Sequence, residues 1–222
     1  MAVTDDDRLD VEPGVFQVSA TLEYHAEVAR ILLADSLRLL QLVILPSFEP
    51  ESAVYVTKTG ARCQGAAGGG LIVTTGRPRQ QLWATAMEPA AEAEPGRPRV
   101  FRAPTAAHFA SLSPAVDWAR APISEDAFRH ILAVWDAALI AARPRERASI
   151  ILDGTSYHFA TPTRSGLARS PDPSSIPGEL AKIGVQLSEL PRIVAKDDRS
   201  ARERALVSAA DRLLARASAS AS

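Results

Sequence analysis

The chain has 222 residues, a length at which one domain buries about 70% of the surface that its unfolded chain exposes. Its hydrophobic share of 46% and charged share of 23% are those of an ordinary globular protein and exclude a fully disordered chain. The net charge of −1 provides no long-range positive field, so we expect no nucleic-acid partner.

The start of the chain and its cysteine content predict a cytoplasmic protein. Residues 5–7 are three aspartates, where a secretory signal has a basic start followed by an apolar run. Residues 28–45 are the most apolar stretch, but they are interrupted by charged residues, whereas a membrane-spanning helix needs about 20 nearly uncharged residues. Cys63 is the only cysteine and has no internal disulfide partner, which fits a reducing compartment. We therefore expect no membrane partner.

The overall patterning predicts an α+β protein with a single domain. Residues 15–195 are expected to form an antiparallel sheet or meander packed by two to four helices. A flexible acidic amino terminus, residues 1–14, precedes this domain, and residues 196–222 are expected to contain a helix and a disordered Ala/Ser tail. Residues 88–99 are rich in proline and glutamate and contain no large apolar residue, which predicts an exposed loop.

The first elements in chain order are a strand, a helix and a second strand. Residues 15–22 are predicted to form an early strand. From Glu23 onward apolar residues recur at helical intervals, and residues 43–45 then resemble a buried strand that ends at Pro46. The apolar positions of the predicted helix are Val28, Ile31, Leu32, Leu39 and Leu40.

Three strands are predicted next. Residues 53–59 alternate between apolar and polar side chains, as a half-buried strand does. Residues 71–75 and 81–87 supply two more strand candidates, separated by a Gly and Pro turn. Together the three segments predict an antiparallel meander. Val100 and Phe101 suggest a short further strand, and residues 104–122 have no clean periodicity.

The second half of the domain predicts two capped helices and a hairpin. Ser124 is a helix N-cap, and an apolar stripe continues from it until Arg143 and Pro144. Asp153 and Gly154 favour a type I′ turn, which predicts a hairpin of residues 149–152 with residues 155–159. Ser175 caps a helix that Pro191 ends, and residues 200–217 predict a surface helix.

A search for catalytic, cofactor and metal motifs predicts none of these sites. The glycines of residues 65–70 lack the Lys and Ser or Thr of a phosphate-binding loop and predict a turn. The histidines have no zinc-binding spacing. Ser156 and His158 share one side of a strand but lie about 7 Å apart at the backbone, too far for a Ser–His hydrogen bond. Arg62 is the one positive charge next to Cys63, and a single neighbouring charge is not enough to predict a reactive thiolate.

The sequence therefore favours binding over catalysis, with another protein as the expected partner and the oligomeric state left open. Three residues in the predicted hairpin and the loop after it form the candidate partner-binding surface: Tyr157, His158 and Arg164. The same residues fit an ordinary sheet edge.

Two segments resemble a loose class of uncharacterised bacterial proteins. One is Pro-Ser-Phe-Glu-Pro-Glu, residues 46–51, leading into a strand; the other, residues 128–190, contains the Trp135 helix and Leu-Asp-Gly-Thr-Ser-Tyr-His-Phe, residues 152–159. Frequent Ala, Arg and Pro with scarce Lys also fits a bacterium with a GC-rich genome. Some small bacterial proteins of this kind look like immunity proteins, so the resemblance implies the neutralisation of a toxin by occlusion of its active site.

Two other functions remain open. One is a hydrolase or transferase whose site is assembled only in three dimensions, with Glu51, Asp153 or His158 as candidate groups. The other is a structural subunit that assembles through the C-terminal helix.

Overall fold

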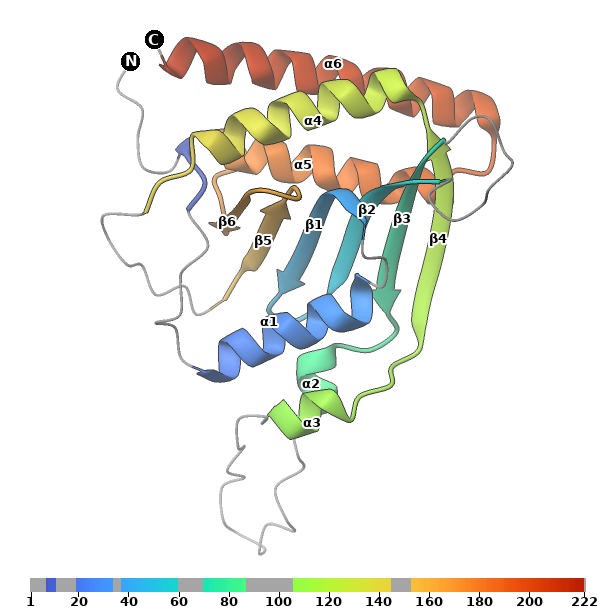
Figure 1. The fold of residues 1–222 in the computed structure, drawn as a ribbon, viewed down its shortest axis with the longest axis vertical. Coiled ribbons are helices and arrows are strands. Elements are labelled where there is room, and N and C mark those ends of the chain that lie inside the picture. Colours follow the sequence, from blue (N-terminus) through green and yellow to red (C-terminus); the bar gives the residue numbers. More distant parts are fainter. Residues whose placement is uncertain are drawn as a thin grey trace, which may run out of the picture.

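A six-stranded antiparallel sheet lies between two groups of helices in the computed structural model, which describes residues 7–10, 19–33, 37–59, 70–86, 106–144 and 153–221 (Figure 1). The helices are α1 (Ser19–Leu32), α2 (Leu82–Ala86), α3 (Ala106–Ala110), α4 (Glu125–Ile140), α5 (Ile176–Glu189), the 3-10 helix η2 (Leu190–Arg192) and α6 (Lys196–Ala221). The strands are β1 (Arg38–Pro46), β2 (Ser52–Lys58), β3 (Leu71–Pro78), β4 (Val116–Ile123), β5 (Thr155–Ala160) and β6 (Ser165–Arg169). The predicted α+β class with an antiparallel sheet is confirmed.

The strands follow the order β4-β3-β2-β1-β5-β6, and every neighbouring pair is antiparallel. Strands β1 to β4 form a meander, after which the chain crosses over and adds β5 to the free side of β1. Successive side chains of each strand point to opposite faces of the sheet, and both faces are apolar. Leu42 pairs with Val54 and Phe159 on one face, and Val43 pairs with Ala53 on the other.

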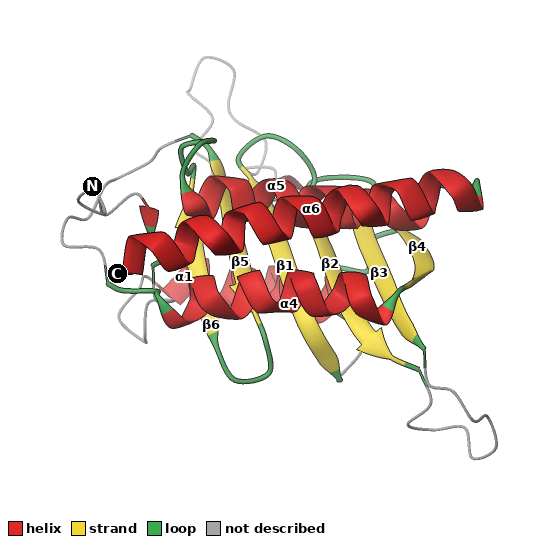
Figure 2. Ribbon diagram, turned by 90° about the horizontal axis from the view of Figure 1, so that it is seen from above, coloured by secondary structure: helices red, strands yellow, loops and turns green. Residues whose placement is uncertain are grey.

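The larger core lies between the sheet and helices α4, α5 and α6, on the surface that we call the α4 face (Figure 2). Helix α4 begins where predicted, because the Ser124 hydroxyl accepts a hydrogen bond from the Ala127 N–H. Trp135 on this helix is fully buried. Gly184 on α5 allows the close approach, since a Cβ there would lie 2.3 Å from Leu42 Cδ2 and 3.2 Å from Trp135 Cη2.

Helix α6 belongs to the core of the domain. Leu206, Ala210 and Leu213 recur at helical spacing and are buried against the larger core. The helix extends to Ala221, so the expectation of a disordered Ala/Ser tail is wrong for residues 218–221. The three buried residues hold α6 against the larger core, and the Ala/Ser segment continues this helix.

The smaller core lies on the opposite surface of the sheet, the α1 face, beneath α1, α2 and α3. Tyr24, Val28 and Leu32 are buried at four-residue intervals along α1. The predicted strand of residues 15–22 is therefore wrong from Ser19 onward, where the chain is helical, and residues 15–18 lie outside the described part. Leu39 and Leu40, expected in the helix, belong to β1.

The predicted strand of residues 81–87 is also wrong, because Leu82–Ala86 form α2, and residue 87 lies outside the described part. Residues 104–122, which had no clean periodicity, contain α3 and most of β4. Leu9 is buried, and Asp10 exchanges two backbone hydrogen bonds with Leu167, so part of the expected flexible amino terminus is fixed to the domain. The loop of residues 88–99 and the short strand at Val100 and Phe101 lie outside the described residues.

The hairpin predicted around Asp153 and Gly154 is not formed. Strand β5 has two edges, and these pair with β1 and β6, which leaves no place beside β5 for residues 149–152. Residues 149–152 themselves lie outside the described part. The turn of the actual hairpin joins β5 to β6, where the Thr161 N–H donates to the Arg164 carbonyl at 2.9 Å.

Candidate functional site

Glu51, one of the candidate catalytic groups, is fully buried and accepts hydrogen bonds from three donors. The backbone N–H groups of Leu82 and Trp83, in the first turn of α2, donate to its two carboxylate oxygens at 2.8 Å and 3.2 Å. The Tyr24 hydroxyl donates to the same carboxylate from α1. This carboxylate therefore connects the β1–β2 turn to α1 and α2, which is a structural role.

The rings around Glu51 complete an aromatic cluster. Tyr24 contacts Trp83 and Phe109 with ring centroids 5.1 Å and 5.4 Å apart. Trp83 and Phe109 are 5.7 Å apart. Because α1, α2 and α3 each contribute one ring, the cluster and the Glu51 carboxylate together hold the three helices against the α1 face.

Burial, the nearby Glu51 charge and the hydrogen bond to Glu51 raise the pKa of Tyr24 above its ordinary value of 10.0. The folded protein then keeps the Tyr24 proton at a pH where the unfolded chain loses it. This stabilisation is fully present below about pH 10 and is lost as the pH rises above that value.

We expect Tyr24→Phe to remove this alkaline loss of stability. Above about pH 10 the wild type loses up to about 1.4 kcal/mol more per pH unit than the variant, since one proton is involved. Urea unfolding across this range measures both slopes. Parallel slopes for the two proteins would contradict a Tyr24 proton that is retained only in the folded state.

The three candidate partner-binding residues do not form one surface. Tyr157 packs against the core of the α4 face. His158 points to the opposite α1 face, where the centroid of its ring lies 4.5 Å from that of His25. Arg164 is exposed in the β5–β6 turn. Asp153 is exposed beside Gly154, whose N–H donates to the Ser47 hydroxyl at 2.9 Å.

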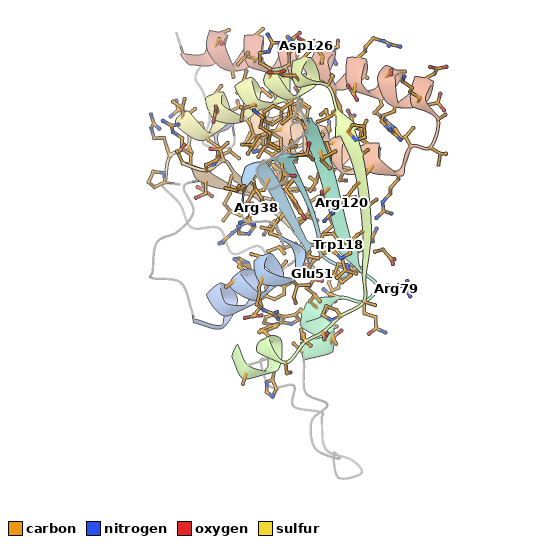
Figure 3. The ribbon with its side chains drawn as sticks, turned by 45° about the vertical axis from the view of Figure 1, so that its right-hand side comes forward. Arg38, Glu51, Arg79, Trp118, Arg120 and Asp126 are labelled. Carbon is orange, nitrogen blue, oxygen red and sulfur yellow. The ribbon has the colours of Figure 1, made fainter. Side chains whose placement is uncertain are left out.

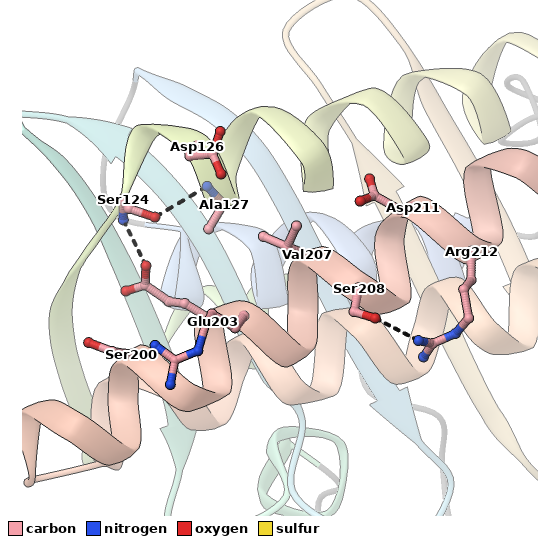
Figure 4. A pocket seen from close by; sticks show the side chains of 10 residues that line it. Ser124, Asp126, Ala127, Ser200, Glu203, Val207, Ser208, Asp211 and Arg212 are labelled. Atoms are coloured by element: carbon pink, nitrogen blue, oxygen red, sulfur yellow. Dashed lines mark hydrogen bonds between the residues drawn. The ribbon is translucent and has the colours of Figure 1, made fainter.

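Helices α4 and α6 border an open groove of about 520 Å³ (Figure 4). The Glu203 carboxylate accepts from the Ser124 N–H at 3.2 Å, and the Ser208 hydroxyl accepts from Arg212 at 2.7 Å. His130 Nδ1 lies 2.5 Å from Asp211, and its Nε2 lies 3.8 Å from Asp126. His130 is thus placed between two carboxylates, and its contact with Asp211 joins α4 to α6.

Strand β4 forms one edge of the sheet, and among the described residues it pairs only with β3. The Arg79 N–H donates to the Ala115 carbonyl at 3.0 Å in continuation of the β3–β4 register. Hydrogen-bonded and non-hydrogen-bonded pairs alternate in an antiparallel ladder. The odd-numbered residues of 117–123 therefore direct their backbone groups toward β3, and the even-numbered residues of 116–122 direct theirs outward.

The prolines of the two strands agree with this assignment. Pro122 occupies an outward position, and Pro78 is opposite Val116 in a pair without hydrogen bonds. A proline has no N–H, and these two positions donate no N–H to the β3–β4 ladder. Neither proline therefore interrupts the ladder. The outward edge of β4 thus carries the N–H groups of Val116, Trp118 and Arg120 and the carbonyls of these residues and Pro122.

The side chains of Trp118 and Arg120 project from β4 on the α1 face, at the edge of the sheet (Figure 3). Trp118 is 42% exposed. Its ring lies over Gly76 of β3, where an added Cβ would be 2.5 Å from the indole. On the other face Arg79 forms an ion pair with Asp117 at 3.0 Å. The edge therefore combines outward backbone groups with an accessible indole.

The opposite edge of the sheet is paired with another segment of the chain at one residue of β6, Leu167. Asp10 and Leu167 of β6 exchange two backbone hydrogen bonds, each 2.8 Å long. Among the described segments, β4 has β3 as its only neighbour in the ladder. Sequence reasoning missed this site, although Pro122 and the exposed Trp118 in a short apolar segment are the signals that mark an edge strand.

Comparisons with protein-family models, curated proteins and solved structures found no match to this chain. Within the described ranges, no three His, Cys, Asp or Glu side chains come together in a way that fits a metal ion. None of the helices in these ranges has both the length and the apolar character needed to cross a membrane.

Proposed function

We propose that this protein is a non-catalytic protein-binding protein whose contact surface is the β4 edge, defined as residues 116–122 with the side chain of Trp118. The observation that carries the proposal is the outward row of backbone N–H and carbonyl groups on β4. Such a row accepts an additional strand from another polypeptide, and the backbone hydrogen bonds then supply the affinity.

The Trp118 side chain beside this row suits a binding surface. Tryptophan is among the residue types that contribute most to protein interfaces, because it gives a large contact area with a polar group. Trp118 is held over Gly76, so its ring loses little conformational freedom on binding. The enzyme alternative gains no comparable support, since the Glu51 carboxylate is engaged by Tyr24 and α2.

An immunity protein that neutralises a bacterial toxin in the cytoplasm is one form of this function. In that form the β4 edge pairs with a strand of the toxin and the body of the protein covers the toxin's active site. This part of the proposal rests on the resemblance of residues 46–51 and 128–190 to a class of bacterial proteins, together with the binding edge.

Capture of partners by edge variants tests the proposal. Trp118→Pro removes one outward N–H and leaves the ladder with β3 intact, whereas Trp118→Ala removes the same side chain and keeps the N–H. We expect a stoichiometric partner from the native lysate to bind the Trp118→Ala protein more weakly than the wild type and to be lost with Trp118→Pro. A partner that both variants retain equally would place the contact elsewhere, and a substrate turned over by the purified protein would refute the non-catalytic assignment.

A further inference from the structure

We infer that the cavity at the carboxyl ends of α4 and α6 binds a small organic anion with an apolar chain, such as a medium-chain carboxylate. The cavity has a volume of about 510 Å³ and is lined by residues 7–9 together with α4, the start of α5 and the last turns of α6. The carboxyl ends of α4 and α6 lie at the far end of the molecule from β4 (Figure 1). A ligand there is therefore separate from the β4 edge of the proposed function.

Apolar side chains form the walls of the cavity. Leu9, Ala138 and Ile176 line it and are buried. Ala137 of α4 and Ala217 of α6 also line it, and their short side chains leave space at this end of the two helices. A cavity of roughly 300–1,000 Å³ with mostly apolar walls and a few polar groups is the usual form of a small-molecule site.

An exposed apolar side chain borders the same cavity. Ile140, the last residue of α4, is part of the lining and is 57% exposed. An apolar chain that lies in the cavity removes its own surface and that of Ile140 from water together. Burial of both surfaces therefore favours binding of a ligand with an apolar chain.

The wall formed by residues 7–9 is anchored on two sides, so the cavity is preformed. The Arg143 N–H, just beyond α4, donates to the Leu9 carbonyl at 3.0 Å. The next residue, Asp10, exchanges two backbone hydrogen bonds with Leu167 of β6. A ligand then enters a space that exists before binding, and little binding energy is spent on ordering the chain.

The charged side chains at the cavity carry one excess positive charge. Arg8, Arg143 and Asp7 belong to the lining. The Asp7 carboxylate lies 3.9 Å from the Arg216 guanidinium, which also pairs with Glu179 at 3.0 Å. Three arginines thus face two carboxylates, and this balance favours an anionic ligand over a cationic one.

Arg8 is the residue that offers its charge to the ligand. Its side chain is exposed and has no hydrogen bond or ion pair within the described part of the chain. Arg143, in contrast, donates from Nη1 to the carbonyls of Ile140 and Ala142 at 3.0 Å and 2.7 Å. A guanidinium presents two parallel N–H groups to a carboxylate. A carboxylate on Arg8 with its chain along the apolar walls therefore uses both parts of the cavity.

Titration of the full chain with straight-chain carboxylates tests the ligand class. We expect hexanoate, octanoate and decanoate, each below its micellar concentration, to bind with dissociation constants that fall by up to about fourfold per added methylene group. Octylamine has the same chain length as octanoate but a positive charge, and it should bind more weakly. Amide shifts in two-dimensional NMR spectra measure the affinities. Absence of binding up to the solubility limit, an affinity that does not rise with chain length, or octylamine binding as tight as that of octanoate would overturn the inference.

A variant that fills the cavity tests its location. Ala137→Leu occupies space that two or more methylene groups of the ligand take up, so we expect the dissociation constant of octanoate to rise by about tenfold. Ala133→Leu is the matched control, because Ala133 is an exposed residue of the same helix outside the lining. Circular dichroism and thermal unfolding verify that both variants fold. Equal octanoate affinities for the two variants would show that the carboxylate binds elsewhere.

A charge variant tests the role of Arg8 without any change in the core. We expect Arg8→Ala to raise the dissociation constant of octanoate by about fivefold, the effect of an exposed ion pair, and to leave that of 1-octanol unchanged. Arg192→Ala removes an exposed arginine from η2, outside the cavity lining, and should bind both ligands like the wild type. An octanoate affinity that is the same in the Arg8→Ala and wild-type proteins would refute recognition of the anion by Arg8.

Discussion

Glu51→Ala is expected to lower the free energy of unfolding by about 3–5 kcal/mol, because it leaves three buried donors without their acceptor. Among the described residues, the Leu82 and Trp83 N–H groups have no other acceptor, and the Tyr24 hydroxyl loses its carboxylate. Since the acceptor lies on the β1–β2 turn, the loss also detaches α2 from the sheet. Urea denaturation measures the global change, and hydrogen exchange at Leu82 and Trp83 measures the opening of α2.

Glu49→Gln is the matched control for this prediction. Glu49 is two residues away in the same turn, and its only described partner is Arg77, in an ion pair of 3.3 Å between exposed side chains. Exposed ion pairs contribute about 0–1 kcal/mol, so this variant should be close to the wild type. Glu51→Gln keeps one acceptor oxygen but points an amide at buried donors, and we expect an intermediate loss. A Glu51→Ala protein as stable as Glu49→Gln would show that Glu51 holds nothing together.

Trp135→Ala is the second large effect, with an expected loss of about 3–5 kcal/mol. The side chain is fully buried between the sheet and α5, with the ring of Phe159 at 5.2 Å and Gly184 beside it. The glycine cannot refill the space, so a cavity remains where the indole was. Chemical denaturation of the variant measures this loss.

Two companion variants make the result specific. Ile140→Ala, on the same helix but at a position that is 57% exposed, should change the stability by less than about 1 kcal/mol. Trp135→Phe should lose clearly less than the alanine variant, because the indole N–H has no acceptor among the described residues and no hydrogen bond is broken. Equal losses for Trp135→Ala and Ile140→Ala would contradict the packing described for α4.

The sequence predicts helices α4 and α5 almost completely, since each has a serine cap and a clear apolar stripe. Strands β2 and β3 follow equally well from their alternation and their glycine turns. In these segments the local signals and the tertiary packing agree. The prediction is therefore correct without any knowledge of the neighbours.

The candidate site could not be predicted in the same way. Helix α2 has a strand-like sequence. Its helical start is stabilised by Glu51, about thirty residues earlier in the chain, which accepts hydrogen bonds from the first N–H groups of the helix. Strand β4 lacks a clean alternation of apolar and polar residues. At the edge of the sheet only part of one face of the strand is buried, and its tryptophan is exposed to solvent. Both elements depend on contacts that are distant in sequence.

The amino-acid sequence by itself determined the class of this protein, an antiparallel sheet packed by capped amphipathic helices, because periodicity and capping act within a few residues. Tertiary structure alone decided that β5 pairs with β1 and β6, and hence that Asp153 and Gly154 do not form the predicted hairpin turn, and that β4 is an edge strand. Backbone pairing joins segments far apart in the chain, and its partners are set by the burial of both sheet faces at once.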